Sequence, residues 1–336
     1  MTEAVVLTAP GTLEVVQRVS RPLGFGEVRL RVDAAGICGS DVHGYAGLND
    51  RRPVGVVMGH ETIGTVIETS EGSTLGVGTR VAVNPVVACD ACDQCRAGRD
   101  NLCVQRRLYG CCLEFDGGLA TDMVVRVANC VRVDARADVL GLALIEPMAV
   151  GTHAVQLARV RSGSEVLVLG GGPIGIAAAL ASMNAGASVL ISELMPGRRE
   201  LAEKLGATTC VPEELRAATT EFELAFECVG VAQTVHDAIT NVPPGGTVIC
   251  LGLAGTTMEV PAAPLVVQER RMLGSSAYTN EDFAETARSV AAHAGNLASL
   301  VEHTVGLAEM PQVFADYHDG RLSAMKTLYL NDGASP

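Results

Sequence analysis

The stretch Glu165–Glu193, EVLVLGGGPIGIAAALASMNAGASVLISE, decides the fold of this 336-residue chain. Its inner part, Val166–Ser192, carries no charged residue and is long enough for a membrane-spanning helix, which needs about 20 apolar residues. Five glycines and Pro173, however, would break or weaken one continuous helix. We interpret the stretch as a buried strand, a glycine-rich turn, a helix and a second strand, an arrangement typical of a parallel sheet.

The glycine-rich turn has the spacing of a phosphate-binding loop. Gly170, Gly172 and Gly175 form G-x-G-x-x-G, and Pro173 and Ile174 complete the turn where the helix begins. The first glycine permits the tight turn, the second lets a pyrophosphate approach the backbone, and the third allows close packing of helix on strand. The N-terminus of the helix offers unpaired N–H groups to the phosphates. The turn therefore predicts a dinucleotide site.

Glu193 ends the second strand and bears on which dinucleotide binds. An acidic side chain at this position accepts hydrogen bonds from the adenosine ribose and repels a 2′-phosphate, so the sequence favours NAD over NADP. Arg198 and Arg199 follow within one turn and weaken that preference if they face the ribose; the alternative is that they lie on a solvated helix face. We expect Arg198 to lie in the cofactor site.

The pattern of predicted strands and helices changes along the chain. The length predicts two domains, since a domain has about 100–200 residues. Short β-rich runs fill the first part, strands and helices alternate in the middle, and the tail returns to the first part. We predict a β-rich domain over 1–150, a doubly wound parallel α/β domain of the Rossmann type over 151–277, and a C-terminal return over 278–336.

Composition excludes several classes of function. The formal net charge of −13 repels nucleic acid and anionic lipid, and aromatic residues at 3% leave little for stacking bases. The N-terminus, MTEAVVLTAP, lacks the basic and apolar regions of a secretory signal. We therefore expect a cytoplasmic protein with no nucleic-acid or membrane partner, in which the eleven cysteines are metal ligands or buried residues.

Four of these cysteines, Cys89, Cys92, Cys95 and Cys103, lie close together in a polar segment, 89–103. Four thiolates that close a tetrahedron describe a structural zinc site with no open position. The alternative is an iron–sulfur cluster, for which bacterial ferredoxins use C-x2-C-x2-C-x3-C followed by proline. Here the last spacing is seven residues and no proline follows, so zinc is favoured.

A second set of metal-binding and proton-carrying residues is spread over three motifs, AGICGSDVHGY, GHE and LIEPMAVGTHAV. With the glycine turn and the four cysteines, the chain resembles the zinc-dependent alcohol dehydrogenases of the medium-chain dehydrogenase/reductase superfamily, over nearly its whole length. The resemblance implies a GroES-like catalytic domain beside the nucleotide domain. The residues that carry it are Cys38, Ser40, His43, His60, Glu61 and Glu146.

The resemblance also implies a role for each of these residues. In the polyol and secondary-alcohol branch the catalytic zinc would be held by Cys38, His60 and Glu146, with Glu61 as an alternative ligand or supporting carboxylate. One thiolate and one carboxylate neutralise Zn²⁺ and leave a fourth position open. Ser40 and His43 occupy the positions that carry the substrate proton away. With the four-cysteine site, the expectation is two zinc ions per chain.

The substrate is the part of the function that the sequence leaves most open. Sorbitol dehydrogenases, similar in CGSDVH and EPMAVGTHAV, carry a tyrosine and an arginine where this chain has Gly44 and Ala277. We therefore expect an NAD-dependent dehydrogenase of a secondary alcohol, diol or polyol, or of the corresponding ketone. A threonine- or butanediol-type dehydrogenase and a catalytically silent NAD-binding relative are the alternatives. The family also implies a homodimer or homotetramer.

Overall fold

The computed structural model describes residues 1–48, 51–218, 221–255, 257–331 and 333, and the chain forms two compact units. Unit 1 consists of Met1–Glu146 and Thr279–Pro336, and unit 2 of Pro147–Tyr278. The sequence predicts boundaries at 150 and 277, and the units join at Glu146–Pro147 and at Tyr278–Thr279. Unit 1 is therefore assembled from both ends of the chain, whereas unit 2 is one continuous segment.

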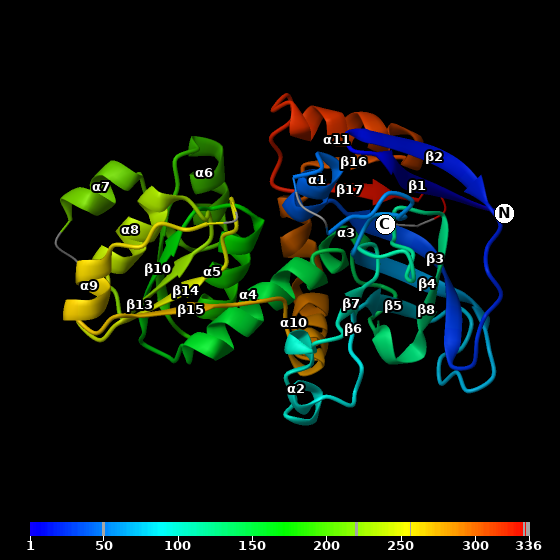
Figure 1. The fold of residues 1–336 in the computed structure, drawn as a ribbon, viewed down its shortest axis with the longest axis horizontal. Helices are drawn as coiled ribbons and strands as arrows, with labels where there is room; N and C mark the ends of the chain where they lie inside the picture. The colour runs from blue at the N-terminus through cyan, green and yellow to red at the C-terminus, as the bar shows by residue number, and fades with distance from the viewer. Residues whose placement is uncertain (49–50, 219–220, 256, 332, 334–336) are drawn as a thin grey trace. The chain divides into compact units, whose positions relative to one another are not determined.

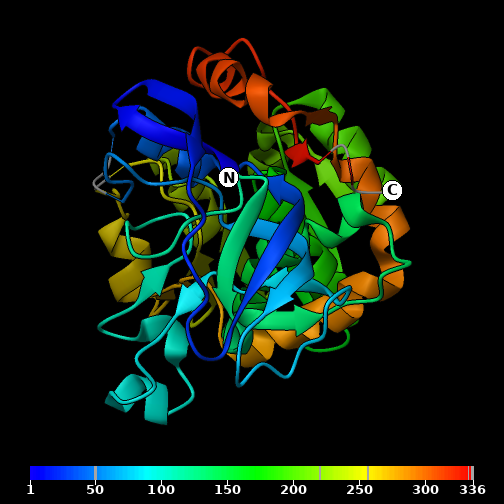
Figure 2. The same cartoon turned by 90° about the vertical axis from the view of Figure 1, so that its right-hand side faces the viewer.

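Unit 1 is built on a mostly antiparallel sheet with the strand order β16-β17-β3-β4-β5-β9, and β8 also pairs with β3. Its apolar side chains, among them Leu30, Met58 and Phe314, form one buried cluster. Figure 2 shows the red strand β17 and the orange helix α10 beside the blue and teal strands. The strands of unit 1 are β1 Thr2–Ala9, β2 Thr12–Arg18, β3 Glu27–Gly36, β4 Glu61–Thr69, β5 Arg80–Val83, β6 Val86–Val87, β7 Arg107–Leu108, β8 Asp122–Arg126, β9 Cys130–Arg132, β16 His303–Val305 and β17 Thr327–Leu330.

Three of these strands bring distant residues of the sequence to one place. In the sheet Gly36 at the end of β3 pairs with Glu61 at the start of β4, and also with Leu328 of β17. The residues next to these pairs, Cys38, His60 and Lys326, therefore lie close together. The helices of unit 1 are α1 Gly39–Tyr45, α2 Asp93–Arg96, α3 Val139–Leu142, α10 Asn280–Leu297 and α11 Met310–His318.

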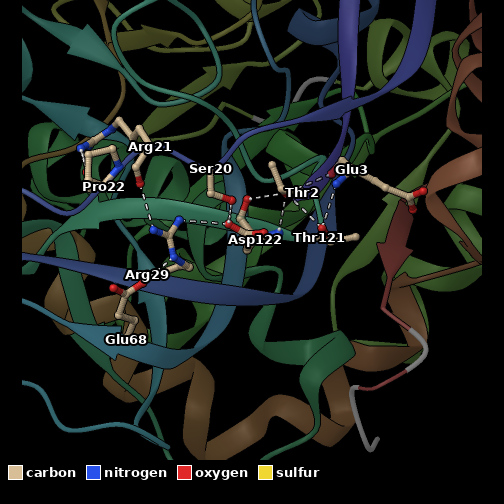
Figure 3. A network of polar contacts seen from close by, with 9 residues as sticks. All are labelled: Thr2, Glu3, Ser20, Arg21, Pro22, Arg29, Glu68, Thr121 and Asp122. Carbon is tan, nitrogen blue, oxygen red and sulfur yellow. Dashed lines mark hydrogen bonds and ion pairs between the residues drawn. The ribbon is translucent and has the colours of Figure 1, made fainter.

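A polar network joins the first strand of the chain to this sheet (Figure 3). The hydroxyl of Thr2 lies 3.0 Å from that of Thr121, which also accepts a hydrogen bond from the backbone N–H of Glu3. Arg29 on β3 donates to Glu68 of β4 at 2.7 Å and to Asp122 of β8 at 3.3 Å. Three strands are thus joined by the side chains of one arginine and its two acidic partners.

Unit 2 is a six-stranded parallel sheet with the order β12-β11-β10-β13-β14-β15. Figure 1 labels four of these strands, β10, β13, β14 and β15. Numbered within the unit, this order is 3-2-1-4-5-6, that of the Rossmann fold. The run Val166–Ser192 spans β10, the turn, α5 and β11, as the sequence predicts. The strands are β10 Glu165–Leu169, β11 Ser188–Ser192, β12 Thr208–Cys210, β13 Leu224–Glu227, β14 Thr247–Cys250 and β15 Arg271–Gly274.

Helices of unit 2 pack against this sheet. Helix α5 contacts β10, β11 and β13, and α8 contacts β10, β13 and β14. Leu167, Ala225 and Ile239 lie in the core between sheet and helices. Within the described ranges no helix is long and apolar enough to cross a membrane. The helices are α4 Ile145–Ala158, which begins at the end of unit 1, α5 Pro173–Asn184, α6 Pro196–Lys204, α7 Pro212–Ala217, α8 Ala232–Thr240 and α9 Ala262–Val267.

Candidate metal centre and nucleotide-binding turn

Cys38, His60 and Glu61 form a group of potential metal ligands in unit 1. One donor atom from each lies within 4.8 Å of the others. Cys38 precedes the first turn of α1, and His60 and Glu61 lie where β4 begins. A thiolate, an imidazole and a carboxylate make up a donor set that suits Zn²⁺, with a further position open. The residues present therefore fit a zinc ion.

Asp41 orients the histidine of this group. Its Oδ1 lies 3.2 Å from His60 Nδ1, so Nε2 is the ring nitrogen that remains for a metal. Its Oδ2 accepts a hydrogen bond from the backbone N–H of Cys38 at 3.2 Å. Burial alone would raise the pKa of Asp41, but the positive charges of His60 and Arg52 outweigh burial and hold that pKa well below its usual range. Asp41 is therefore a buried carboxylate that contacts two of the three donor residues.

Lys326 supports the third residue of the group. Its Nζ lies 2.6 Å from both carboxylate oxygens of Glu61 and donates to the carbonyl of Ile37 at 3.1 Å. Burial would lower the pKa of Lys326, but the negative charges of Glu61, Cys38 and Glu146 raise it. A Cβ on Gly36 would lie only 1.9 Å from Glu61 Oε2. Glycine at 36 thus makes room for the Glu61 carboxylate, and Lys326 holds it in place.

The other residues predicted for this site have different positions. Glu146 lies in the first turn of α4 and is not part of the 4.8 Å group, although its charge acts on Lys326. The group contains Glu61, which the resemblance implies as an alternative ligand or a supporting carboxylate. Ser40 and His43 both lie on α1, three residues apart and thus on one face. Ser40 is half-buried and His43 is exposed.

Cys89, Cys92, Cys95 and Cys103 form the second potential metal site of unit 1. Their four sulfurs lie within 4.8 Å of one another. Cys95 Sγ is 3.5 Å from Cys92 Sγ and 3.9 Å from Cys89 Sγ. Zn–S bonds of about 2.3 Å in a tetrahedron require sulfurs roughly 3.8 Å apart. Hydrogen bonds from the backbone of Cys95 and Val104 lower the pKa of Cys92 to about 6, which favours the thiolate. These residues also fit zinc.

The segment that carries these cysteines is joined to a long helix. Asp100, between the third and fourth cysteine, accepts from the backbone N–H of Asn280 at 3.0 Å. Asn280 is the first residue of α10, whose N-terminal N–H groups have no partner within the helix. Asn84 also donates to the side chain of Asn280, at 2.6 Å. The four-cysteine segment therefore contributes to the cap of α10.

In unit 2 the glycine turn has the geometry of a phosphate cradle. Gly170 has φ +94°, in the region that favours glycine, and a Cβ on Gly175 would lie 1.8 Å from the carbonyl oxygen of Gly170. Gly172 is the N-cap of α5, with Pro173 and Ile174 in the first turn. A Cβ on Gly172 would meet only Arg198 Nη1, at 3.8 Å. The space above the turn is therefore open to a ligand.

Glu193 lies against this turn. Its Oε2 accepts from the backbone N–H of Gly171 at 2.7 Å, and its Oε1 from that of Met195 at 2.8 Å. Arg199 donates to the carbonyls of Glu193 and Leu194, each at 2.8 Å, so this guanidinium contacts backbone. Glu193 thus fixes the turn and presents a negative charge beside it, as binding of a ribose requires.

Sequence reasoning missed three supporting residues. Asp41 lies inside the quoted motif CGSDVH but has no spacing that marks it. Lys326 is one of only two lysines among 25 basic residues, which is a signal, but its partner is 265 residues away. Glu227, fully buried at the end of β13, accepts from the backbone N–H of Val229 and of Gly230 and fixes the next loop. No local pattern distinguishes it from an ordinary strand end.

Comparison with known proteins identifies both parts of the chain. Residues 24–135 match the family model described as "Alcohol dehydrogenase GroES-like domain". Residues 173–292 match the model described as "Zinc-binding dehydrogenase". The β-rich part and the Rossmann part thus both belong to zinc-type dehydrogenases.

Relatives and solved structures cover almost the whole chain. Sorbitol dehydrogenase from Gallus gallus is 32% identical over 93% of this chain and 92% of its own length. 2-Dehydro-3-deoxy-L-galactonate 5-dehydrogenase from Pseudoalteromonas atlantica is 30% identical over 90% and 91%. A zinc-binding dehydrogenase from Sinorhizobium meliloti, solved with NADP bound, superposes with a TM-score of 0.91 at 30% identity and covers 98% of this chain and 99% of its own. The chain therefore belongs to the zinc-type medium-chain alcohol dehydrogenases, in their polyol dehydrogenase branch, and is an oxidoreductase of secondary alcohols that uses zinc and a nicotinamide cofactor.

Proposed function

We propose that this chain is an NAD-dependent dehydrogenase of a hydroxyl-rich secondary alcohol, with its catalytic zinc held by Cys38 and His60 together with a carboxylate. The observation that carries the proposal is the placement of one thiol, one imidazole and one carboxylate oxygen within 4.8 Å of one another. Either Glu61 or Glu146 completes the set. Glu61 belongs to the group, and the negative charge of Glu146, in the first turn of α4, acts on the same Lys326.

Zinc held by these residues would supply a Lewis acid for deprotonation of the substrate hydroxyl, and a nicotinamide cofactor at the glycine turn would supply the hydride acceptor or donor. Ser40 Oγ relays the proton, because its half-buried hydroxyl accepts the substrate proton as it gives up its own toward His43. His43, exposed on the same face of α1, passes that proton to solvent. Asp41 holds the His60 ring during this step, and Lys326 holds Glu61.

The proposed substrate class rests on the named relatives and on two side chains of sorbitol dehydrogenases that this chain lacks. The named relatives act on a sugar acid and on a sugar alcohol, which share a secondary hydroxyl flanked by others. Gly44 and Ala277 give this chain neither the tyrosine hydroxyl nor the arginine charge of sorbitol dehydrogenases. We therefore expect polyols, diols and sugar acids as substrates, with sorbitol itself a weak one. Threonine and 2,3-butanediol are the alternatives.

A substrate panel read by NADH formation tests the proposal. Sugar acids, acyclic and cyclic polyols, 2,3-butanediol and threonine are compared by kcat/KM, with the Cys38→Ala variant as the blank. Oxidation of at least one hydroxyl-rich alcohol by the native chain and none by the variant supports the proposal. A native protein that holds zinc and binds NAD but oxidises no member of the panel would be a catalytically silent relative.

We propose NAD as the preferred cofactor because Glu193 places a carboxylate beside the turn. The NADP-bound relative and the position of Arg198 near Gly172 argue for testing NADP with equal care. The ratio of kcat/KM for the two cofactors decides the preference. Glu193→Ser should shift that ratio toward NADP, because it removes the charge that repels the 2′-phosphate. A clear NADP preference in the native protein contradicts the assignment.

The second zinc is assigned to the four-cysteine segment, where it stabilises the fold. Metal analysis should find about two zinc ions per chain, and iron with a visible charge-transfer band would contradict this assignment. Replacing Cys95 with Ser should lower the melting temperature, because binding of structural zinc contributes directly to folding. Normal thermal stability in that variant would contradict a structural role.

We also propose a homodimer formed through unit 2. Strand β15 is the edge of the six-stranded sheet, and its free side offers unpaired N–H and C=O groups. Val266 and Val267 on α9, just before β15 in the chain, are adjacent apolar side chains that are 72% and 79% exposed. Light scattering should give twice the chain mass, and Val267→Asp should lower it.

We propose a cytoplasmic location, because the free thiols fit a reducing compartment.

A further inference from the structure

A buried arginine that belongs to no predicted motif lies beside the donors of the catalytic metal. Arg52 is only 7% exposed, and its Nε and Nη2 donate to Asp41 Oδ1 at 3.0 and 2.7 Å. Asp41 is fully buried. Taking two charges out of water costs more free energy than the pair alone regains in many proteins. The pair is therefore a feature of the site that packing alone does not explain.

One nitrogen of Arg52 reaches a metal-binding residue and a proton-carrying residue at once. Nη2 donates to Ser40 Oγ at 3.3 Å and to Asp41 Oδ1, the oxygen that faces His60 Nδ1, so its link to the His60 ring runs through Asp41. His60 belongs to the metal donors, and Ser40 is the residue to which we assign the first proton transfer. Within the part of the chain that the structure describes, Arg52 is the side chain that lies within 3.5 Å of both residues.

The stem of Arg52 lies in the space that a side chain at position 44 would occupy. A Cβ on Gly44 would be 2.2 Å from Arg52 Cγ and 2.8 Å from Arg52 Cβ, which no real structure tolerates. Position 44 is where the similar sorbitol dehydrogenases carry a tyrosine. The glycine is therefore more than a missing hydroxyl, because it makes room for the buried cation.

We propose that Arg52 is a positioning residue that fixes His60 and Ser40 together, and that Gly44 is the residue that permits it. Through Asp41, Arg52 holds the His60 ring with Nε2 toward the metal. Through its contact with Ser40, it holds the hydroxyl that receives the substrate proton. The claim that Arg52 positions the His60 ring for a metal is independent of the proposed function. The claim that it positions the Ser40 hydroxyl for proton transfer rests on that function.

Arg52→Met tests the proposal, since methionine keeps an apolar stem and removes the charge and the donors. Affinity for the catalytic metal is measured by chelator competition, and by the visible spectrum of Co²⁺ placed at that site. We expect affinity to fall about 10–100-fold, as loss of such supporting contacts typically causes. The four-cysteine site should be unaffected. The control is Arg136→Met, which removes a surface arginine paired with Asp134.

A second variant keeps the test decisive if Arg52→Met fails to fold because Asp41 has lost its buried guanidinium partner. Adding Asp41→Asn removes the buried charge and keeps an amide beside His60. In this double variant kcat for the alcohol should remain about tenfold low at saturating zinc, with KM for NAD unchanged. Native metal affinity in folded Arg52→Met, or native kcat in the double variant, would overturn the proposal.

Gly44→Ala provides an independent test without any change of charge. Its Cβ must push Arg52 aside, so it should weaken metal affinity as Arg52→Met does. Gly39→Ala is the matched control on the same helix, because a Cβ there meets nothing within 4 Å. Equal metal affinities in these two variants would contradict the steric argument. A native chain that oxidises no alcohol would refute the proposed function and leave the metal measurements valid.

Discussion

The nucleotide-binding turn and the metal centre are built in opposite ways. The turn uses neighbouring residues, Gly170 to Gly175, and its contacts come from the backbone and from missing side chains. The metal centre uses side chains from the ends of strands that lie far apart in sequence, such as Glu61 and Lys326, 265 residues apart. Added atoms are the main threat to the turn, whereas the metal centre depends as well on partners that a substitution can remove. Each therefore has its own characteristic substitution.

Loss of a metal donor should have the largest effect, on kcat, and should leave NAD binding at the glycine turn unchanged. Cys38→Ala or His60→Ala removes a ligand whose metal stabilises the reaction by several kcal/mol, so kcat should fall by about 10³-fold or more. The Kd for NAD, measured by calorimetry, should stay close to that of the native protein. Cys130→Ala, outside both cysteine groups, is the control. A parallel loss of NAD affinity would mean that the two sites are not independent.

Removing the distant partner should have the next largest effect. Lys326→Met leaves the Glu61 carboxylate buried without its cation, which typically costs about 3–5 kcal/mol of folding free energy. Denaturant unfolding of unit 1 measures this loss. Lys204→Met is the matched control, since that lysine is exposed on α6. A midpoint equal to the control's would show that the pair does not stabilise the site.

A methyl group added to the turn should lower stability by less than the loss of Lys326 does. Here the cause is an added atom and not a lost partner. Gly175→Ala puts a Cβ 1.8 Å from the carbonyl oxygen of Gly170, and such overpacking typically costs about 1–3 kcal/mol. We expect a lower melting temperature and weaker NAD binding. Gly197→Ala, where a Cβ meets nothing within 4 Å, should leave both unchanged or slightly raise stability. Equal behaviour of the two variants would contradict close packing at Gly175.

The smallest effect on stability should come from Gly172→Ala. Its Cβ meets only Arg198 Nη1 at 3.8 Å, so the cost is that of alanine in place of glycine at an N-cap, about 1 kcal/mol of unfolding free energy. The same methyl group occupies the approach of the pyrophosphate, so NAD affinity should still fall. Thermal unfolding and calorimetry on the same sample separate the two effects. Native NAD affinity would show that the phosphates do not approach Gly172.

The difference between a site built from neighbouring residues and one built from distant residues explains how much of each the sequence predicts. The strand, turn and helix around Gly170–Gly175 depend on local spacing, so the sequence predicts the turn, the Rossmann order and Glu193. The cysteines at 89–103 are close enough in sequence to be grouped by spacing alone. The choice between Glu61 and Glu146 depends on strand register, which spacing does not reveal. Resemblance to a family supplied the ligand types but placed Glu146 first, whereas the sheet places Glu61 in the group.

Supporting residues were the hardest to predict because their signal exists only after folding. Asp41 and Arg52 satisfy each other in the interior, and nothing in RRPVG marks a buried arginine. Gly44 is visible in the sequence as a departure from sorbitol dehydrogenases, yet its reason is the stem of Arg52. Tertiary contacts of this kind decide how the site works, whereas local patterns decide where its elements lie.

The pairing of β17 with β3 has a consequence for synthesis of the protein. A ribosome that adds about 5–20 residues per second needs roughly 13–53 s to proceed from Glu61 to Lys326, 265 residues later. Unit 2, continuous in sequence, emerges within that interval and has all of its strands before unit 1 has its last. Nascent chains halted before residue 326 should therefore show protease-resistant unit 2 with unit 1 still open to cleavage. The metal site is thus among the last parts of the molecule to be completed.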